Sequence, residues 1–410
     1  MPELPADVRR GVDPALIVIL AGVAAALHVG KLPPALPVLR EVFALTLVEA
    51  GFLLSLVQFA GMTLGLVVGL AAGSWGLRRC MMSGLVILSG ASMLGGFAHD
   101  AAALLILRAF EGLGLLLAVT PAPSLIRRLA SSRNSDMMLG LWGAYMPFGT
   151  AAALLASPWL LHRFGWQSLW WLLAAPSLVM AVWVWSAVPA DGSEHSAAAA
   201  AWTARLQRTL SSRGAWLMAL TFAVYSGQWL AVIGFLPSIY AQAAIAGETA
   251  GALTALAAAM NIVGNAAAGR LLQRGVAAPT LLYCGFAAMA AGAALAFMPA
   301  LHGGAVVQYI AVLIFSMLGG LVPATLFALS VRLAPDGHTV ATTVGWMQQL
   351  SALGQFTGPP LVAWVANRVG DWHWTWVVTG VFSAAGVLLS TCIAVLLRPQ
   401  SQSRSRAGTP

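Results

Sequence analysis

The sequence predicts an all-α membrane protein whose twelve transmembrane helices form two six-helix halves. Three observations support this fold class: the scarcity of charge, a series of long apolar runs, and the uneven distribution of arginine. Of the 410 residues, 60% are hydrophobic and 8% are charged, whereas a soluble domain carries about 25% charged residues. Most of the outer surface must therefore face an apolar medium, which excludes a water-soluble fold.

Twelve apolar segments are long enough to cross a bilayer, which takes about 20 helical residues. They are residues 14–38, 48–72, 79–98, 100–124, 137–161 and 167–188, followed by 214–239, 248–271, 279–299, 304–331, 339–366 and 372–397. A polar stretch between the two sets is the only long loop. We therefore divide the chain into an N-terminal tail, a first bundle, a central loop, a second bundle and a C-terminal tail: residues 1–13, 14–188, 189–213, 214–397 and 398–410.

The positive charges lie in short clusters between the apolar runs. With a cytoplasmic N-terminus, sixteen arginines fall in cytoplasmic segments and three, Arg40, Arg163 and Arg368, fall outside. By the positive-inside rule both termini are cytoplasmic, as in a multi-pass protein of a bacterial inner membrane. The net charge of +8 therefore reflects orientation, and since no basic stripe is interleaved with aromatics, we expect no nucleic-acid partner. No cleavage site follows the polar N-terminus, so we expect a retained first helix.

The two halves resemble repeats of one another. Gly143 to Pro158 in the fifth span aligns at a constant offset with Gly345 to Pro360 in the eleventh, and similar loops follow both. The segment Gly69 to Arg79 after the second span has a counterpart in Gly264 to Arg274. Two related halves around an axis along the membrane normal place a substrate site between them, near the midplane.

The loop after the second span reads GLAAGSWGLRR, with Gly69, Gly73, Gly76, Arg78 and Arg79 at its marked positions. It resembles the loop motif between the second and third spans of the major facilitator superfamily. The spaced glycines and terminal arginines match, which implies a gating role for this loop. Gly73 stands where the family usually has an acidic residue, so a charge relay through that acid does not carry over.

Further segments extend the resemblance over most of the chain. Arg108 to Gly114 (RAFEGLG) is similar to the fourth-span motif, and Gly143 to Gly149 matches the Gly/Pro motif of span five more loosely. Gly227 to Tyr240 and Gly320 to Pro360 are most similar to the cyanate permease and nitroimidazole transporter group. The resemblance implies a monomeric transporter that works by alternating access.

Few ionisable residues lie inside the spans, where a charge costs roughly 2.5–3.5 kcal/mol. They are Lys31, Arg108 and Glu111, with the titratable His28 alongside. Lys31, the only lysine, is either a cation at a cavity mouth that binds an anion or a side chain snorkelling to the outer interface.

Arg108 and Glu111 share a helix face because they are three residues apart. They form either a structural ion pair or part of a substrate and proton site, in which Glu111 is the best candidate for proton coupling. His28 lies three residues before Lys31 and is either a second coupling group or a packing residue.

Uncharged polar and aromatic residues complete the candidate substrate site. The resemblance implies that spans one, two, four, five, seven, eight, ten and eleven line the cavity, which selects Tyr145, Gln228, Trp229, Trp346, Gln348 and Gln349. Interhelical hydrogen bonding or packing is the alternative role for each. Trp166, Trp170, Trp372 and Trp374 fit an outer interfacial belt.

Several classes of protein are not supported by the sequence. No phosphate-binding Gly-x-x-x-x-Gly-Lys-Ser/Thr occurs, so ATP-driven transport is unsupported. No catalytic triad or metal-ligand spacing is found, so we expect neither an enzyme nor a cofactor. Because two of the three embedded charges are positive, we expect a secondary transporter of a small organic or inorganic anion, with protons as a candidate coupling ion. A drug/proton efflux antiporter of the same fold and a non-transporting sensor or assembly partner are the alternatives.

Overall fold

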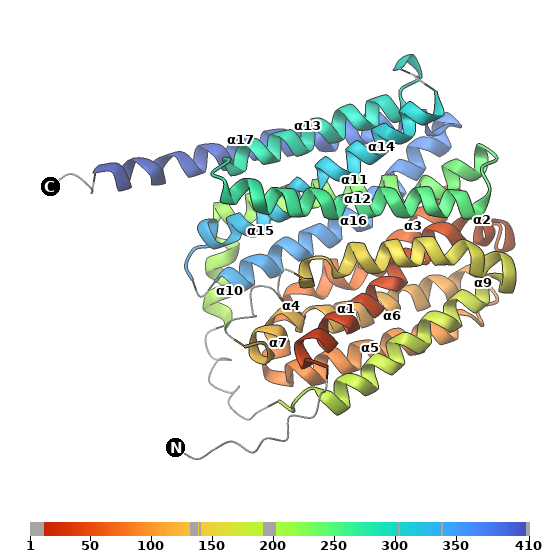
Figure 1. Ribbon diagram of the computed structural model, residues 1–410, viewed down its shortest axis with the longest axis horizontal. Coiled ribbons are helices and arrows are strands. Elements are labelled where there is room, and N and C mark those ends of the chain that lie inside the picture. Colours follow the sequence, from red (N-terminus) through yellow and green to blue (C-terminus); the bar gives the residue numbers. More distant parts are fainter. Residues whose placement is uncertain are drawn as a thin grey trace.

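The computed structural model describes residues 12–131, 138, 141–191, 202–301, 304–337 and 339–406, without the side chains of residues 73, 74, 341 and 399–406. The predicted N-terminal tail lies outside this range except for residues 12 and 13. All regular elements of the described chain are helices, and Figure 1 shows them running nearly side by side in two groups, red to lime and green to blue.

Helices α1 to α9 form the N-terminal half. Its spans are α1 (Pro14–Gly30) with α2 (Leu32–Val42), α3 (Leu47–Ser55) with η1 (Leu56–Gln58) and α4 (Phe59–Trp75), α5 (Leu77–Gly95), α6 (Ala101–Val119) with α7 (Ala122–Leu129), and α9 (Tyr145–Ala187). The last of these contains two crossings, because Gly165 (φ 78°, ψ 169°) turns the chain within it. The residues on both sides of Gly165 are helical, whereas we expected a loop between the fifth and sixth spans.

Helices α11 to α17 form the C-terminal half. Its spans are α11 (Arg213–Gln242), α12 (Gly247–Gln273), α13 (Ala278–Phe297) followed by η3 (Pro299–Leu301), α14 (Ala305–Gly319) with α15 (Leu321–Leu333), α16 (Val340–Val369), and η4 (Trp372–Trp374) with α17 (Thr375–Arg406). The predicted central loop contains a further helix, α10 (Trp202–Leu210), which packs on α11 and α16. Helix α17 continues well past residue 397, the predicted end of the last span.

Ten helical stretches of the described chain are long and apolar enough to cross a membrane. One of the ten is the 43-residue α9, which crosses twice, and the 30-residue α16 is not among them. Counting both crossings of α9 and the one of α16 gives the twelve spans that the sequence predicts.

Helix starts follow local capping chemistry. Asp13 accepts from the backbone of Ala15 at the start of α1, and Asp100 accepts from Ala103 at the start of α6. Thr46 and Glu49 form a reciprocal capping box at α3. These caps satisfy amide groups that would otherwise lack partners at the membrane boundary.

The hydrophobic core that the two halves share lies mainly at one end of the bundle. At the end away from the termini, one cluster joins residues of both halves, including Leu32, Leu54, Phe235 and Ala363. Towards the termini the N-terminal half has its own cluster and the C-terminal half another, which Leu154 of α9 also joins. Contacts between halves are made by α2 with α11, α3 and α4 with α16, and α9 with α12.

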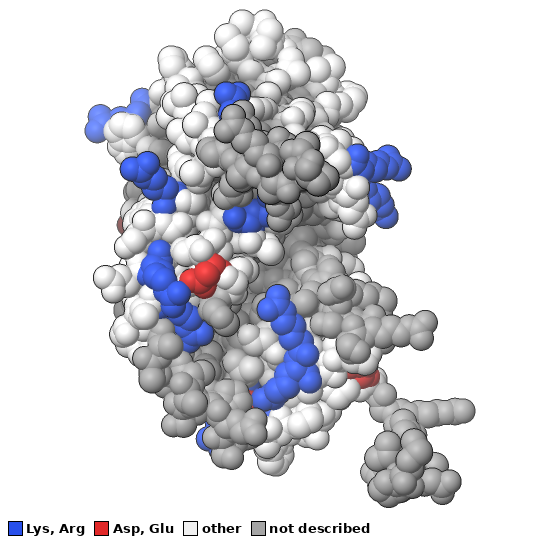
Figure 2. All heavy atoms as spheres, turned by 90° about the vertical axis from the view of Figure 1, so that its left-hand side faces the viewer, with Lys and Arg blue, Asp and Glu red and all other residues white. Residues whose placement is uncertain are grey.

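The start of α1 and the end of α17 lie at the same end of the bundle (Figure 1). Figure 2 views this end and shows Lys and Arg side chains spread over it with few acidic ones. We call it the arginine-rich end; among its residues are Arg78, Arg79, Arg127, Arg128, Arg213, Arg270, Arg274 and Arg332.

Candidate functional site

A proline pair interrupts the first span beside two of the predicted site residues. Pro33 and Pro34 have no backbone N–H, so the carbonyls four residues before them lose their helical partners. The first span is divided at Lys31 into two helical segments, α1 and α2. Interrupted spans of this kind mark binding sites in many transporters.

The carboxylate of Glu111, on α6, lies between two cations. Its Oε1 is 2.5 Å from Lys31 Nζ and its Oε2 is 2.6 Å from Arg108 Nη1. Arg108 Nη1 also donates to the backbone carbonyl of His28 at 2.7 Å, which ties α6 to α1. All four side chains are at most 1% exposed. The structure therefore brings the four ionisable candidates into one buried group, the charged cluster: His28, Lys31, Arg108 and Glu111.

All three hydrogens of the Lys31 ammonium can be accounted for. Besides Glu111, Nζ donates to Ser92 Oγ at 2.9 Å and lies 3.3 Å from His28 Nδ1. An ammonium only donates, so Nδ1 accepts and the proton of neutral imidazole is assigned to Nε2. That nitrogen is 2.9 Å from Ser177 Oγ.

Lys31 does not snorkel to an interface. Its side chain is 0% exposed, and its ammonium lies 4.5 Å from the centroid of the Trp170 ring. The interfacial-belt interpretation is also wrong for Trp170, Trp166 and Trp372, which are buried, and fits only Trp374. The start of the sixth span packs inside the core that both halves share, so these rings face protein.

Arg108 has a free edge. Its Nη1 is used by Glu111 and by the His28 carbonyl, but Nε and Nη2 have no hydrogen-bond partner among the described residues. With neutral His28, two cations face one carboxylate, so the charged cluster carries one uncompensated positive charge. Buried charge without a partner is costly, and these two nitrogens leave hydrogen-bond donors of the cluster unused.

Gln228 on α11 occupies the place that His28 has in the other half. Its Oε1 accepts from Ser383 Oγ at 3.0 Å, so each residue meets a serine of the last span of its own half. The offset that pairs His28 with Gln228 pairs Lys31 with Ala231. The C-terminal half thus repeats the frame without the charge, and Gln228 Nε2 has no partner within the described chain.

The three predicted aromatic residues lie apart from the charged cluster. Trp229 Nε1 donates to a serine hydroxyl of α14 at 3.0 Å. Tyr145 stacks on Trp142 with centroids 3.9 Å apart. Trp346 meets Trp216 edge-on at 4.8 Å. All three rings are partly buried.

The two neighbouring glutamines of α16 differ. Gln348 is exposed, and no hydrogen bond of its side chain is recorded among the described residues. Gln349 has both amide atoms bonded to the backbone of α4, at Leu66 N and Met62 O. Unlike Gln228, Gln349 therefore has no side-chain nitrogen or oxygen that lacks a hydrogen-bond partner.

The glycine-rich loop is held by an acid from elsewhere in the chain. Gly76 has φ 105°, and Asp191, just after α9, accepts from the backbone N–H groups of Arg78 and Arg79 at 3.1 to 3.3 Å. Partial burial raises the pKa of Asp191, but the N–H of Arg78, the Arg128 guanidinium and the N–H of Arg79 outweigh it, so the pKa is lowered.

Asp191 lies beside the glycine-rich loop, in which Gly73 stands where the family motif usually has an acidic residue. The surroundings of Gly73 fall outside the described side chains, and a Cβ on Gly69 would meet only Thr120 of the same half. Arg128 Nη1 pairs with Asp191 Oδ1 at 2.9 Å. Asp191 thus connects the starts or ends of three helices within the N-terminal half.

Sequence reasoning missed the residues that position the charged cluster. Ser92 and Ser177 look like ordinary small residues of a membrane helix, and Trp170 looks interfacial. One signal was present: the offset that pairs Trp166 with Trp372 also pairs Ser177 with Ser383. Among the described residues, no group of three or more His, Cys, Asp or Glu is placed to hold a metal ion.

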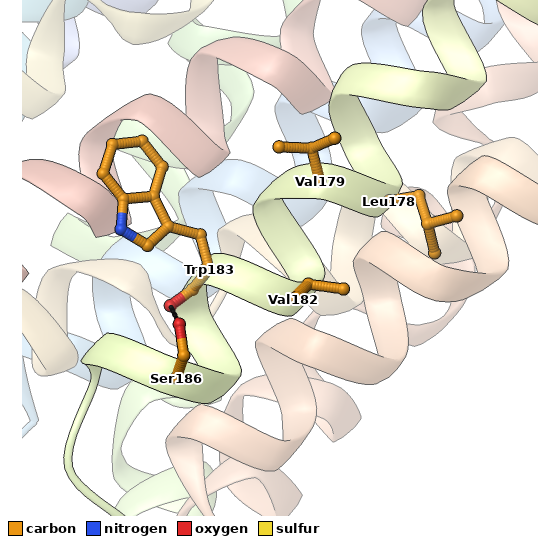
Figure 3. Close-up of a pocket in the computed structure, with 5 residues that line it drawn as sticks. All are labelled: Leu178, Val179, Val182, Trp183 and Ser186. Carbon is orange, nitrogen blue, oxygen red and sulfur yellow. Dashed lines mark hydrogen bonds between the residues drawn. The ribbon is translucent and has the colours of Figure 1, made fainter.

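A shallow hollow on the second part of α9 is not a candidate substrate site. It has a volume of about 460 Å³ and is lined by Leu178, Val179, Val182, Trp183 and Ser186 (Figure 3). Its residues come from one helix, and the first three are at least half exposed. This surface suits lipid chains.

Comparison with known proteins identifies a matching family, similar folds and related sequences. The family model described as Major Facilitator Superfamily matches residues 16–359. The D-xylose-proton symporter structure has TM-score 0.71 and 16% identity, covering 92% of this chain and 95% of the symporter. A bacterial homologue of the human lysosomal transporter Spinster has TM-score 0.76 and 13% identity, covering 94% of this chain and 98% of the homologue. The twelve-helix fold is confirmed.

Two curated relatives come from Escherichia coli strain K12. The cyanate transport protein is 26% identical over 253 residues, which is 59% of this chain and 62% of that protein. The match thus spans less than two thirds of that relative. The 2-nitroimidazole transporter is 25% identical over 393 residues, 88% of this chain and 89% of the transporter. The resemblance to this group of transporters is confirmed.

Proposed function

The chain belongs to the major facilitator superfamily, and on this premise we propose that it is a secondary transporter that carries a small anion across a bacterial inner membrane by alternating access. Both termini are cytoplasmic in this proposal, because α1 starts and α17 ends at the arginine-rich end and positive charge favours the cytoplasmic side. The transporter acts as a monomer.

The observation that carries the proposal is the free edge of Arg108. Nε and Nη2 lie on one edge of the guanidinium and present parallel N–H groups, which suit two acceptor atoms of one anion. The excess positive charge of the cluster adds attraction in a medium where charges interact strongly. A bound anion would accept hydrogen bonds from Nε and Nη2 and would at the same time neutralise the excess charge of the cluster.

The names of the relatives are compatible with such a substrate. Cyanate is a small linear anion, and 2-nitroimidazole is a small planar molecule with two acceptor oxygens on one group. Gln228, Trp229, Tyr145, Gln348 and Trp346 are the further candidates for contact with the solute. Gln228 is the strongest of them, since its buried Nε2 is unpartnered.

Proton coupling through Glu111 belongs to the same proposal. While it is ionised, Glu111 neutralises one of the two cations. Protonation of Glu111 would raise the charge of the cluster by one and release both cations for an anion. Proton and anion would then bind more tightly together than apart, with His28 as a second group that exchanges the proton.

The distribution of the core supports alternating access. The halves share a hydrophobic cluster at the end away from the termini and have mainly separate clusters towards the arginine-rich end. Rocking of the halves would break the shared cluster and bring the other ends together.

Uptake by proteoliposomes tests the proposal. We expect saturable, proton-dependent uptake of labelled cyanate or a comparable small anion, and a loss of at least about tenfold in uptake for Arg108→Gln, the value of a charge-assisted bidentate contact. Arg127→Gln, which changes an exposed arginine of α7, is the matched control. Unchanged affinity and rate for Arg108→Gln would refute the anion site.

One observation favours drug/proton efflux as the second candidate. Arg108 is paired with Glu111, as that alternative predicts, although it leaves the free edge unexplained. Export of a neutral aromatic compound that survives Arg108→Gln and fails in Glu111→Gln would support efflux. A non-transporting role would require the absence of flux for every solute tested.

A further inference from the structure

A glutamine of α16 reaches into the backbone of α4 across the boundary between the halves. Gln349 Oε1 accepts from Leu66 N and Gln349 Nε2 donates to Met62 O, both at 2.9 Å. Met62 and Leu66 are four residues apart, so these are the donor and acceptor of one helical turn. A single carboxamide therefore bridges that turn and joins the two halves.

Small residues of α4 permit this close approach. A Cβ on Gly65 would lie 3.4 Å from Gln349 Cβ, and a Cβ on Gly61 would lie 3.0 Å from Ala352 Cβ. A long side chain at Gly65 would hold the helices apart and withdraw the amide from the backbone.

A second glutamine contact lies further from the arginine-rich end on the same pair of spans. Gln58, at the 3₁₀ break before α4, donates from Nε2 to Gln355 Oε1 at 3.1 Å. Gln355 Nε2 in turn donates to Ser351 Oγ at 3.2 Å. Two polar contacts therefore join the second span, through η1 and α4, to α16.

Within the part of the chain that the structure describes, the repeat-related seam between α9 and α12 has no such contact. The offset that pairs Gly143 with Gly345 pairs Pro147 with Gln349 and Ala153 with Gln355, and neither replacement has a side-chain amide. A Cβ on Gly143 would meet nothing within 4 Å, whereas one on Gly345 would lie 3.6 Å from Leu66. Among the described residues at this depth, only the α4–α16 seam is held by side-chain amides.

We propose that Gln349, assisted by the Gln58–Gln355 pair, is a latch that keeps the α4–α16 seam closed inside the bundle. It stabilises the present conformation and releases when the halves separate along this seam. The latch rests on the alternating access of the proposed function, but it does not depend on the solute being an anion.

Disulfide trapping in native membranes tests the latch. Cysteines replace Gly61 and Ala352, whose Cβ positions are 3.0 Å apart, in a background where Cys80, Cys284 and Cys392 are serine. The rate of oxidative cross-linking reports how often the seam is closed. Gln349→Leu should lower the closed-to-open equilibrium constant about fivefold to tenfold, the effect of losing two intramembrane hydrogen bonds, and the cross-linking rate should fall with the closed fraction.

Two further variants keep the test decisive. Gly65→Leu acts from α4 and should lower the cross-linking rate in the same way. Thr357→Val, on α16, removes a hydroxyl bonded only within its own helix and should leave the rate unchanged. An unchanged or faster rate in both Gln349→Leu and Gly65→Leu would overturn the latch. Because cross-linking needs no solute, failure of the anion proposal alone would leave these results as expected.

Discussion

Glu111 holds the charged cluster together because it is the only carboxylate facing Lys31 and Arg108 among the described residues. Removing it leaves two buried cations, whereas removing Lys31 leaves a neutral Arg108–Glu111 pair. We therefore expect Glu111→Gln to cost about 3–5 kcal/mol of unfolding free energy and Lys31→Met clearly less. Thermal unfolding of both variants in one detergent measures the order. A Lys31→Met variant as unstable as Glu111→Gln would contradict a cluster with excess positive charge.

The sequence was sufficient to select the members of the cluster but not its depth. Ionisable residues are rare in spans, so Lys31, Arg108, Glu111 and His28 were found by elimination. The predicted first span ended at residue 38, which left Lys31 near an interface. Helix α2 continues to Val42 despite its prolines, so Lys31 lies well inside. Its partner hydroxyls and the free edge of Arg108 depend on tertiary packing, which no spacing rule reveals.

At the scale of elements, the loop between α4 and α5 depends on one glycine and one acid. Gly76 has φ 105°, and a Cβ there would lie 2.5 Å from Asp191 Oδ2. Gly76→Ala should therefore cost about 2 kcal/mol or more, since it adds backbone strain and displaces the acid that caps α5.

Gly90→Ala, in the α5 helix that follows this loop, is the matched control, because a Cβ at Gly90 would meet nothing within 4 Å. It should be neutral or slightly stabilising, as alanine is the better helix former. Comparable losses of thermal stability in the two variants would contradict this account of the loop.

The elements themselves were largely predictable, and the exceptions have physical causes. The lengths of the apolar runs located the spans, because each span must form its backbone hydrogen bonds within the bilayer. Gly165 was read as part of a loop because sequence patterns do not show that one glycine with positive φ can turn the chain. Helix α10 was missed because it is only nine residues long and lies in a polar stretch, although Trp202, Leu206 and Leu210 recur at helical spacing within it.

At the scale of the whole molecule, the bundle has one arginine-rich end and a shared core at the other. If the arginine-rich end is cytoplasmic, a cytoplasmic reporter fused at either terminus should be active. A periplasmic reporter inserted after Leu301, at the opposite end of α13, should be active as well. A cytoplasmic reporter that is inactive at the termini, or a periplasmic reporter that is inactive after Leu301, would show that the orientation is the opposite one.

Comparison of the two repeats also shows why the charged cluster belongs to the N-terminal half. His28 and Gln228 occupy related places, but Ala231 stands where the first half has Lys31. The two halves therefore share a frame, and only the N-terminal half carries the charge. Sequence repeats predict the frame, whereas the charge asymmetry follows only from comparing residue with residue.

The central claim is that a small anion binds the free edge of Arg108. The most direct measurement is the thermal stability of the purified protein titrated with cyanate at constant ionic strength, for the unmodified chain and for Arg108→Lys. Saturating anion should stabilise the unmodified protein by about 2.7 kcal/mol at one hundred times its Kd. Arg108→Lys keeps the charge but loses the paired N–H groups, so its Kd should rise at least about tenfold. Equal stabilisation of both proteins, or none by any small anion, would contradict the claim.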